Sequence, residues 1–198
     1  MLITSDASAI ASLMLSNPGS LAAYPTETFY GLGVLINSRD GLDRIITVKG
    51  RDVTKGMIVL VSDLTMASCI AVIDNDQKML LERLWPGPVS VVLEAKQDID
   101  PLIAPDGKVA LRISPNILAT SLVEMVGPIT STSANRSGEP PARTAHEVAG
   151  SGLAIDAIFD GGETPGGKPS TLIDLTTWPP VCLREGAVTF QEILANCS

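Results

Sequence analysis

The 198-residue sequence contains few histidines and cysteines, the residues that build structural zinc sites and disulfides. It has one histidine, His146, and three cysteines, Cys69, Cys182 and Cys197, which lie far apart and form no C-x-x-C pair. A structural zinc site takes four cysteine or histidine ligands at short spacings, so these residues do not make one. We therefore expect reduced thiols and no structural metal.

Positive charge is also scarce. The 14 lysines and arginines are outnumbered by 22 aspartates and glutamates, which gives a formal net charge of −8. Broad binding to RNA requires a basic surface that neutralises phosphate groups. The charge balance argues against such a surface and leaves open a local basic pocket.

Long hydrophobic runs are absent. No stretch approaches the roughly 20 apolar residues of a transmembrane helix, and Met1–Thr4 has no basic segment ahead of an apolar run. We expect a cytoplasmic protein with neither a membrane span nor a signal peptide. Hydrophobic residues make up 45% of the sequence, which suffices for the core of one domain over residues 1–198.

Segments with helical spacing of apolar residues alternate with short apolar runs bounded by glycine, proline and polar residues. This pattern predicts helices interspersed with buried strands. The predicted helices are Ser5–Ser16, Arg39–Val48, Asp63–Ala71, Asp74–Leu84 and Ile117–Val126, with short ones around His146 and at Phe190–Leu194. The predicted strands are Leu21–Tyr24, Met57–Val61, Val89–Leu93, Lys108–Ile113, Ser170–Leu175 and Val181–Arg184.

One polar turn is rich in short hydrogen-bonding side chains. In Gly127–Gly138, GPITSTSANRSG, an apolar run stops abruptly at Ser131, Thr132, Ser133 and Asn135. Ligands of α/β sheets usually bind at strand ends, where such groups can donate and accept hydrogen bonds. The alternative is a plain turn that binds nothing.

Three cations follow the helix predicted at Arg39–Val48, namely Lys49, Arg51 and Lys55. A lysine at a helix C-terminus also complements the helix dipole, so a solvated loop is the alternative explanation. A strongly apolar strand, Met57–Val61, comes directly afterwards, which favours a site at the strand's entrance. We expect Lys49 and Arg51 to lie on a loop and to contribute little to stability.

Arg112 lies inside the predicted strand Lys108–Ile113. Burying a guanidinium is costly unless an anion meets it. Arg112 therefore either faces solvent or binds an anionic ligand in a pocket.

Seven motifs in this order resemble the YrdC/TsaC family and span nearly the whole chain. They are YPTETFYGLG (24–33), KGR (49–51), WPGPVSVVL (85–93), VALRIS (109–114), STSANRSGEPP (131–141), STLIDLT (170–176) and REG (184–186). The resemblance implies an α/β fold, a single YrdC-like domain with a twisted mixed sheet, flanking helices and a concave ligand cleft.

The similarity to the short members of this family implies threonylcarbamoyl-AMP synthase activity. Such enzymes join L-threonine, bicarbonate and ATP into threonylcarbamoyl-adenylate and release pyrophosphate. This is the first step towards N6-threonylcarbamoyladenosine at position 37 of tRNAs that read ANN codons. The implied partners are these substrates, Mg²⁺ arriving on ATP, and the tRNA-modifying transferase complex that receives the adenylate, with at most weak contact to tRNA.

The resemblance also implies the substrate-binding residues. The nucleotide site would comprise the KxR pair Lys49 and Arg51, which are also the candidate catalytic residues, together with Lys55, Lys108, Ser133, Asn135, Pro141 and Arg184. The threonine site would comprise Thr26, Thr28, Arg112, Ser131 and Ser170. Leu60 is a departure, because many longer members have a histidine at the matching position.

Three other functions remain open on the sequence alone. An RNA-binding YrdC-like module would need the basic surface that the net charge argues against. A carbamoyltransferase domain like that of HypF proteins would be accompanied by acylphosphatase and zinc-finger segments, and this sequence has neither. A family paralogue without synthase activity differs from the synthase only in an assay.

Overall fold

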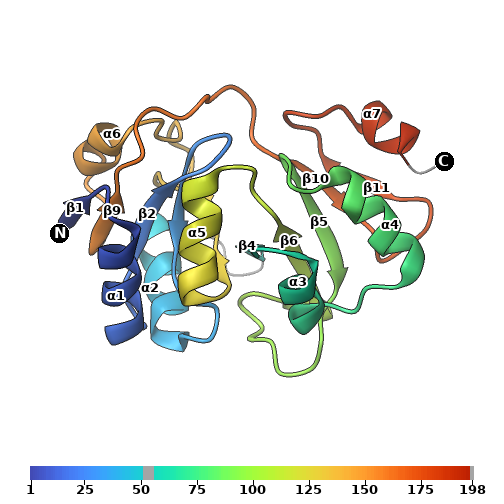
Figure 1. Cartoon of the computed structure of the whole chain (residues 1–198), viewed down its shortest axis with the longest axis horizontal. Coiled ribbons are helices and arrows are strands. Elements are labelled where there is room, and N and C mark those ends of the chain that lie inside the picture. Colours follow the sequence, from blue (N-terminus) through green and yellow to red (C-terminus); the bar gives the residue numbers. More distant parts are fainter. Residues whose placement is uncertain (51–55, 197–198) are drawn as a thin grey trace.

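The computed structural model describes residues 1–50 and 56–196, whose strands form two mixed sheets with helices packed along them (Figure 1). Arg51 and Lys55, two predicted nucleotide-binding residues, lie outside the described residues. The predicted α/β class, the mixed strand directions and the flanking helices are confirmed, and the strands divide between two sheets rather than one.

The first sheet has the order β1-β9-β2-β3-β8. Its strands are β1 (Leu2–Thr4), β2 (Ala22–Pro25), β3 (Tyr30–Gly33), β8 (Thr132–Ser133) and β9 (Ala157–Phe159). The second sheet has the order β11-β10-β5-β6-β4-β7. Its strands are β4 (Ile58–Leu60), β5 (Val89–Glu94), β6 (Lys108–Arg112), β7 (Ile129–Thr130), β10 (Thr171–Asp174) and β11 (Val181–Arg184).

Each α-helix begins after a residue whose side chain accepts a hydrogen bond from the first turn. The sequence therefore located the helices within about two residues, which is the usual uncertainty of helix ends. They are α1 (Ala7–Ser16), α2 (Arg39–Lys49), α3 (Leu64–Ile70), α4 (Asn75–Leu84), α5 (Ile117–Val126), α6 (Ala145–Gly150) and α7 (Phe190–Ala195), with a 3₁₀ turn at Pro105–Gly107.

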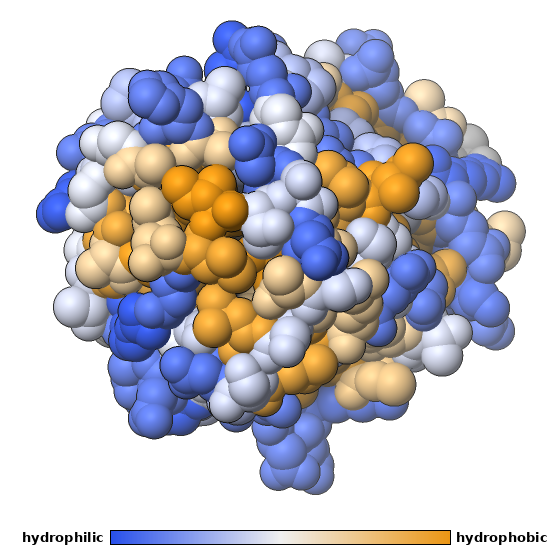
Figure 2. Space-filling model, turned by 60° about the vertical axis from the view of Figure 1, so that its left-hand side comes forward, coloured by the Kyte–Doolittle hydropathy of each residue, from blue (hydrophilic) through white to orange (hydrophobic). Residues whose placement is uncertain are grey.

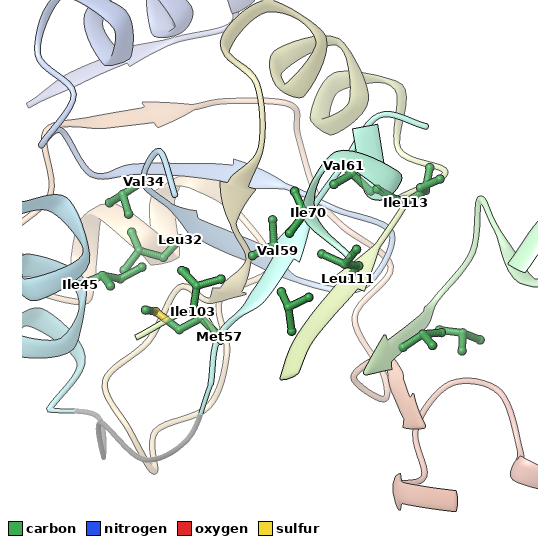
Figure 3. Close-up of a cluster of buried hydrophobic side chains, with 14 of the residues drawn as sticks. Leu32, Val34, Ile45, Met57, Val59, Val61, Ile70, Ile103, Leu111 and Ile113 are labelled. Atoms are coloured by element: carbon green, nitrogen blue, oxygen red, sulfur yellow. The ribbon is translucent and has the colours of Figure 1, made fainter. Parts of the chain in front are cut away.

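One hydrophobic cluster joins the two sheets. The cluster includes Leu32 of β3 and Val34 just after it, together with Val59 of β4 and Leu111 of β6 (Figure 3). A second cluster fills the space between α1, α5 and the first sheet, with Tyr24 at its inner side. The two sheets therefore share one hydrophobic core.

The chain passes directly from one sheet to the other at Ser131. Thr130 ends β7, which pairs with β4, while Thr132 begins β8, which pairs with β3. The backbone N–H of Ser131 still donates to the carbonyl of Ile58 in the second sheet, at 2.6 Å. The polar turn predicted from the sequence is thus the seam between the sheets.

One face of the molecule mixes apolar and polar surface. Figure 2 shows apolar and polar areas interspersed on the side that lies at the left of Figure 1. The large exposed hydrophobic side chains of α1 and α5 are Leu15, Ile117 and Met125. Within residues 1–50 and 56–196, no helix is both long enough and apolar enough to cross a membrane.

Gly33 tests the close packing at the base of this seam. A β-carbon there would lie 2.7 Å from Cε1 of the buried Tyr24 ring and 3.1 Å from the carbonyl oxygen of Thr130. Gly33→Ala should therefore lower the free energy of unfolding by about 1 to 3 kcal/mol, the usual cost of overpacking. Gly150→Ala is the matched control, since no heavy atom lies within 4 Å of its β-carbon position. Urea denaturation of both variants makes the comparison, and equal stabilities would contradict the packing described.

Candidate functional site

A polar cavity opens where the two sheets meet, at the ends of several strands. Its wall comes from Thr26, Thr28, Phe29, Tyr30, Gly31, Ile58, Arg112, Ser131, Thr132, Ser133, Pro169, Ser170 and Arg184. Seven of these were predicted from the sequence: Thr26, Thr28, Arg112, Ser131, Ser133, Ser170 and Arg184. All five predicted threonine-site residues are among them, so the structure brings that set together.

Topology explains this convergence. Thr26 and Thr28 follow the end of β2, and Arg112 is the last residue of β6. Ser170 directly precedes β10, and Arg184 ends β11, which runs antiparallel to β10. Four chain segments that are distant in sequence therefore deliver their polar ends to the Ser131 seam.

Arg112 is a buried cation in the wall of this cavity. Its side chain is only 5% exposed, and Nη2 donates to Oγ of Ser131 at 3.2 Å. Nε lies 3.3 Å from Oε1 of Glu27, whose side chain is 9% exposed. Of the two alternatives predicted for Arg112, the structure excludes exposure to solvent. The guanidinium is buried, and the carboxylate of Glu27 faces one of its edges.

Glu27 is the main residue that the sequence did not single out. It stands between Thr26 and Thr28, in a stretch that was noted only for its threonines. Its second oxygen, Oε2, accepts a hydrogen bond from the Ser114 hydroxyl. The signal available in the sequence was only a lone carboxylate in the polar turn after β2; its contact with Arg112 is seen in the structure.

Tyr24 is a buried residue that links the two sheets next to the cavity. Its hydroxyl donates to the carbonyl of Thr130 at 2.7 Å, and its ring lies against Gly31 and Gly33. Complete burial raises the pKa of the Tyr24 hydroxyl, so this group stays a neutral donor at physiological pH. It thus ties β2 of the first sheet to β7 of the second.

Lys49 lies next to the cavity and holds the turn after Ser133. It is the last residue of α2, is 4% exposed, and precedes Gly50 in the left-handed conformation. Nζ donates to the carbonyls of Ser133 and Asn135 and, at 3.2 Å, to Oδ1 of Asn135. The expectation that Lys49 lies on a loop is wrong, because Lys49 is the last residue of α2. Its buried ammonium and these hydrogen bonds argue that it contributes to stability.

Asn135 completes this turn. Its Oδ1 accepts from the Ser133 hydroxyl, and its Nδ2 donates to the carbonyl of Glu139. Asn135 is buried while Ser133 is exposed. The predicted SxN pair is therefore a single hydrogen-bonded unit with Lys49, at the mouth of the cavity.

Two other predicted nucleotide residues do not line the cavity. Lys108 begins β6, at the opposite end of that strand from Arg112, and contacts Asp174 at 3.3 Å and the Thr176 hydroxyl at 2.6 Å. Pro141 is half-buried on the segment after the turn. Arg184 does line it, and its Nη2 donates to the Ser170 carbonyl at 2.8 Å.

Leu60 stands beside Arg112 in the sheet. The two residues are register partners on β4 and β6, and Leu60 is 1% exposed. Its side chain belongs to the second hydrophobic cluster. Ile58, two residues earlier on β4, lines the cavity, whereas Leu60, the position that departs from the longer family members, does not.

The segment between β9 and β10 crosses from the first sheet to the second (Figure 1). The Tyr30 hydroxyl donates to the carbonyl of Gly162 at 2.8 Å, and the N–H of Gly166 donates to the carbonyl of Thr28 at 2.7 Å. Burial raises the pKa of Tyr30, which keeps this donor protonated. This segment reaches the cavity wall at Pro169 and Ser170.

A resident metal would need a cluster of ligands. Among residues 1–50 and 56–196, no three histidine, cysteine, aspartate or glutamate side chains come together in a way that could hold an ion. The carboxylate nearest the cavity, Glu27, is already engaged by Arg112 and Ser114.

The architecture defines an α/β protein with a polar cleft between two mixed sheets. The family model described as "Telomere recombination", for Sua5, YciO and YrdC, matches residues 15–186. The chain therefore belongs to the Sua5/YciO/YrdC family.

Curated relatives named threonylcarbamoyl-AMP synthase are similar over most of the chain. The Pyrococcus abyssi relative is 40% identical over 180 residues, covering 88% of this chain and 53% of the relative. The Bacillus subtilis relative is 33% identical and covers 98% and 58%. The chain thus spans somewhat more than half the length of these two, and 93% of a Photobacterium profundum relative that is 36% identical over 85% of this chain.

Solved structures agree with this placement. A structure of P. abyssi Sua5 complexed with L-threonine has a TM-score of 0.91 at 35% identity, covering 99% of this chain and 60% of the other. Escherichia coli YciO has a TM-score of 0.84 at 26% identity, covering 98% of both chains. A HypF structure is 17% identical, with a TM-score of 0.77, and supports the fold alone.

Lys49 gives a direct test of the turn. Lys49→Met should lower the free energy of unfolding by about 1.5 to 3 kcal/mol, because the buried carbonyls lose hydrogen bonds from a charged donor. Lys78→Met is the control, since Lys78 is an exposed residue of α4 that faces Glu82 at 3.9 Å. Urea denaturation should separate the two variants, and a Lys49→Met protein as stable as Lys78→Met would refute the bracing role.

Proposed function

We propose that this chain is a threonylcarbamoyl-AMP synthase that forms threonylcarbamoyl-adenylate and pyrophosphate from L-threonine, bicarbonate and ATP. The observation that carries the proposal is the cavity itself, in which one buried guanidinium and several hydroxyls converge from both sheets. Membership of the family and the threonine complex of a relative support it.

We assign the threonine to the inner part of this cavity. Arg112 would bind its carboxylate, because a guanidinium matches a carboxylate with two parallel hydrogen bonds. Ser131 or Ser170 would bind the threonine hydroxyl, and Thr26 and Thr28 would complete the wall. These short side chains lose little conformational freedom when they bind.

We assign the nucleotide to the mouth, beside the turn that Lys49 braces. Ser133, Asn135 and Arg184 lie on that side, with Arg51 and Lys55 predicted from the family motif to join them. Lys108 and Pro141 remain predictions from the same motif. Mg²⁺ would arrive on the triphosphate as part of the substrate, which suits a cleft whose described residues offer no carboxylate cage.

The chemistry requires positioning more than an acid or base of the protein. The threonine amine attacks the carbon of bicarbonate and water leaves, which gives a carbamate. A carbamate oxygen then attacks the α-phosphorus of ATP, and the bond to pyrophosphate breaks. Holding the two reactants in line contributes on the order of 7 to 11 kcal/mol in the best model reactions.

The charge that develops on the phosphate oxygens would be stabilised by cations of the site. Lys49 and Arg51 are the candidate catalytic residues, and Arg184 would assist from β11. The segment from Asp160 to Pro169, between β9 and β10, would help to exclude water from the hydrolysable adenylate. The product would then pass, in the cytoplasm, to the complex that transfers the threonylcarbamoyl group to tRNA.

The direct test is incubation of the protein with MgATP, L-threonine and bicarbonate. We expect pyrophosphate and a threonylcarbamoyl-adenylate mass, both absent when any one substrate is omitted. Threonine binding without either product would instead identify a paralogue without synthase activity. Salt-dependent binding of bare tRNA in the absence of product would favour the RNA-binding module.

Arg112 should matter for threonine more than for ATP. Truncating one member of a buried charge pair commonly costs about 2 to 5 kcal/mol, so Arg112→Ala should raise the threonine KM by at least about tenfold with little change in the ATP KM. Arg112→Lys should rescue only part of this loss, because an ammonium lacks the guanidinium's fork.

Steady-state kinetics with each substrate varied in turn measures this difference. Arg39→Ala is the matched control, because Arg39 is an exposed arginine paired only with Asp43 and Asp100 among the described residues. An unchanged threonine KM with a raised ATP KM would move Arg112 to the nucleotide site.

A further inference from the structure

We infer that Glu27 is a positioning residue, which holds the guanidinium of Arg112 by its Nε edge and so presents the remaining N–H groups to a carboxylate in the cavity. The inference rests on the proposed function, because it concerns how that site receives the carboxylate of threonine. Glu27 does not itself line the cavity, whereas both of its neighbours, Thr26 and Thr28, do.

Glu27 is fixed on the side away from the arginine. Oε2 accepts from the Ser114 hydroxyl, and the same hydroxyl accepts from the N–H of Asn116 at 3.1 Å. The Ser114 carbonyl in turn accepts from the Thr120 hydroxyl at 2.9 Å. Ser114 is 3% exposed, so α5 and the residues before it form a rigid support for this carboxylate.

The pair is poorly suited to a purely stabilising role. Oε1 of Glu27 and Nε of Arg112 are buried and, within the part of the chain that the structure describes, make no well-formed hydrogen bond, although they lie 3.3 Å apart. The desolvation of two buried charges often exceeds their attraction, so a buried ion pair of this kind is weak evidence for stability. What the pair does supply is a defined direction for the guanidinium.

The remaining donors of Arg112 match a carboxylate. A guanidinium has five N–H groups. Nε faces Glu27, and one N–H of Nη2 reaches Ser131. The two donors of Nη1 and the second of Nη2 bind none of the residues 1–50 and 56–196. One edge of the arginine is therefore held by the protein, and the other suits the two oxygens of an amino-acid carboxylate.

Electrostatic attraction alone predicts the opposite effect of removing Glu27. Glu27 partly neutralises Arg112, so any loss of its charge should strengthen the attraction for a second carboxylate. A positioning role requires an oxygen at Nε rather than a negative charge. Glutamine keeps such an oxygen, whereas alanine removes it.

The experiment measures threonine binding and MgATP binding separately by calorimetry, which does not depend on turnover. We expect Glu27→Ala to weaken threonine binding at least about tenfold, and Glu27→Gln to stay within about threefold of wild type, with MgATP affinity unchanged in both. Ser114→Ala leaves the pair in place but loosens Glu27, and it should weaken threonine binding by a smaller factor. It also provides the test if Glu27→Ala does not fold.

Asp156→Ala is the control for the general loss of an ion pair, since Asp156 meets Arg44 at 2.8 Å and is not in the cavity wall. It should leave threonine binding unchanged. Wild-type or tighter threonine binding by Glu27→Ala would overturn the positioning role, as would equal weakening in Glu27→Gln and Glu27→Ala. If the wild-type protein binds no threonine, the proposed function and this inference both fail.

Discussion

The site depends on the point at Ser131 where the chain passes directly from the second sheet to the first. Strand β7 ends the second sheet and strand β8 ends the first, with one residue between them. Because β-strand register fixes which side chains face a cleft, both sheets must be in register for the cavity to exist. The Tyr24 hydroxyl on the Thr130 carbonyl fixes this crossing from below, and Ser131 donates its N–H to Ile58 across it.

The two buried cations near Ser131, Lys49 and Arg112, differ in how many of their hydrogen-bond donors contact the protein. An ammonium has three donors, and three oxygens of Ser133 and Asn135 surround that of Lys49. Arg112 has five donors and the protein occupies one edge. By this criterion Lys49 already shapes the turn with its present contacts, while three donors of Arg112 bind none of the described residues. A phosphate oxygen could approach Lys49 only by sharing or replacing one of its present contacts.

The convergence of Arg112, Ser131 and Ser170 was implied by the resemblance to the family. The residue pattern alone predicted only that the polar turn at Ser131 lies at the end of a buried strand, where ligands of α/β sheets usually bind. It did not predict the two-sheet arrangement, because β7 and β8 have two residues each and leave no periodic signal. Contacts of Glu27 with Arg112, and of Lys49 with Asn135, join residues far apart in the chain. No local pattern encodes such pairs, so the electrostatics of the site required the structure.

The net charge of −8 is compatible, for a physical reason, with the proposal that the cleft binds an anion. Charges on the surface act over roughly the Debye length, about 8 Å at physiological salt, so a largely acidic exterior disfavours a long polyanion laid across it. Inside a cleft, the effective dielectric is lower and a contact of about 3 Å outweighs distant, screened carboxylates. Arg112 and Lys49 are both buried, and the single carboxylate beside Arg112 faces only its Nε edge. The composition therefore argues against broad nucleic-acid binding without arguing against a small anionic substrate.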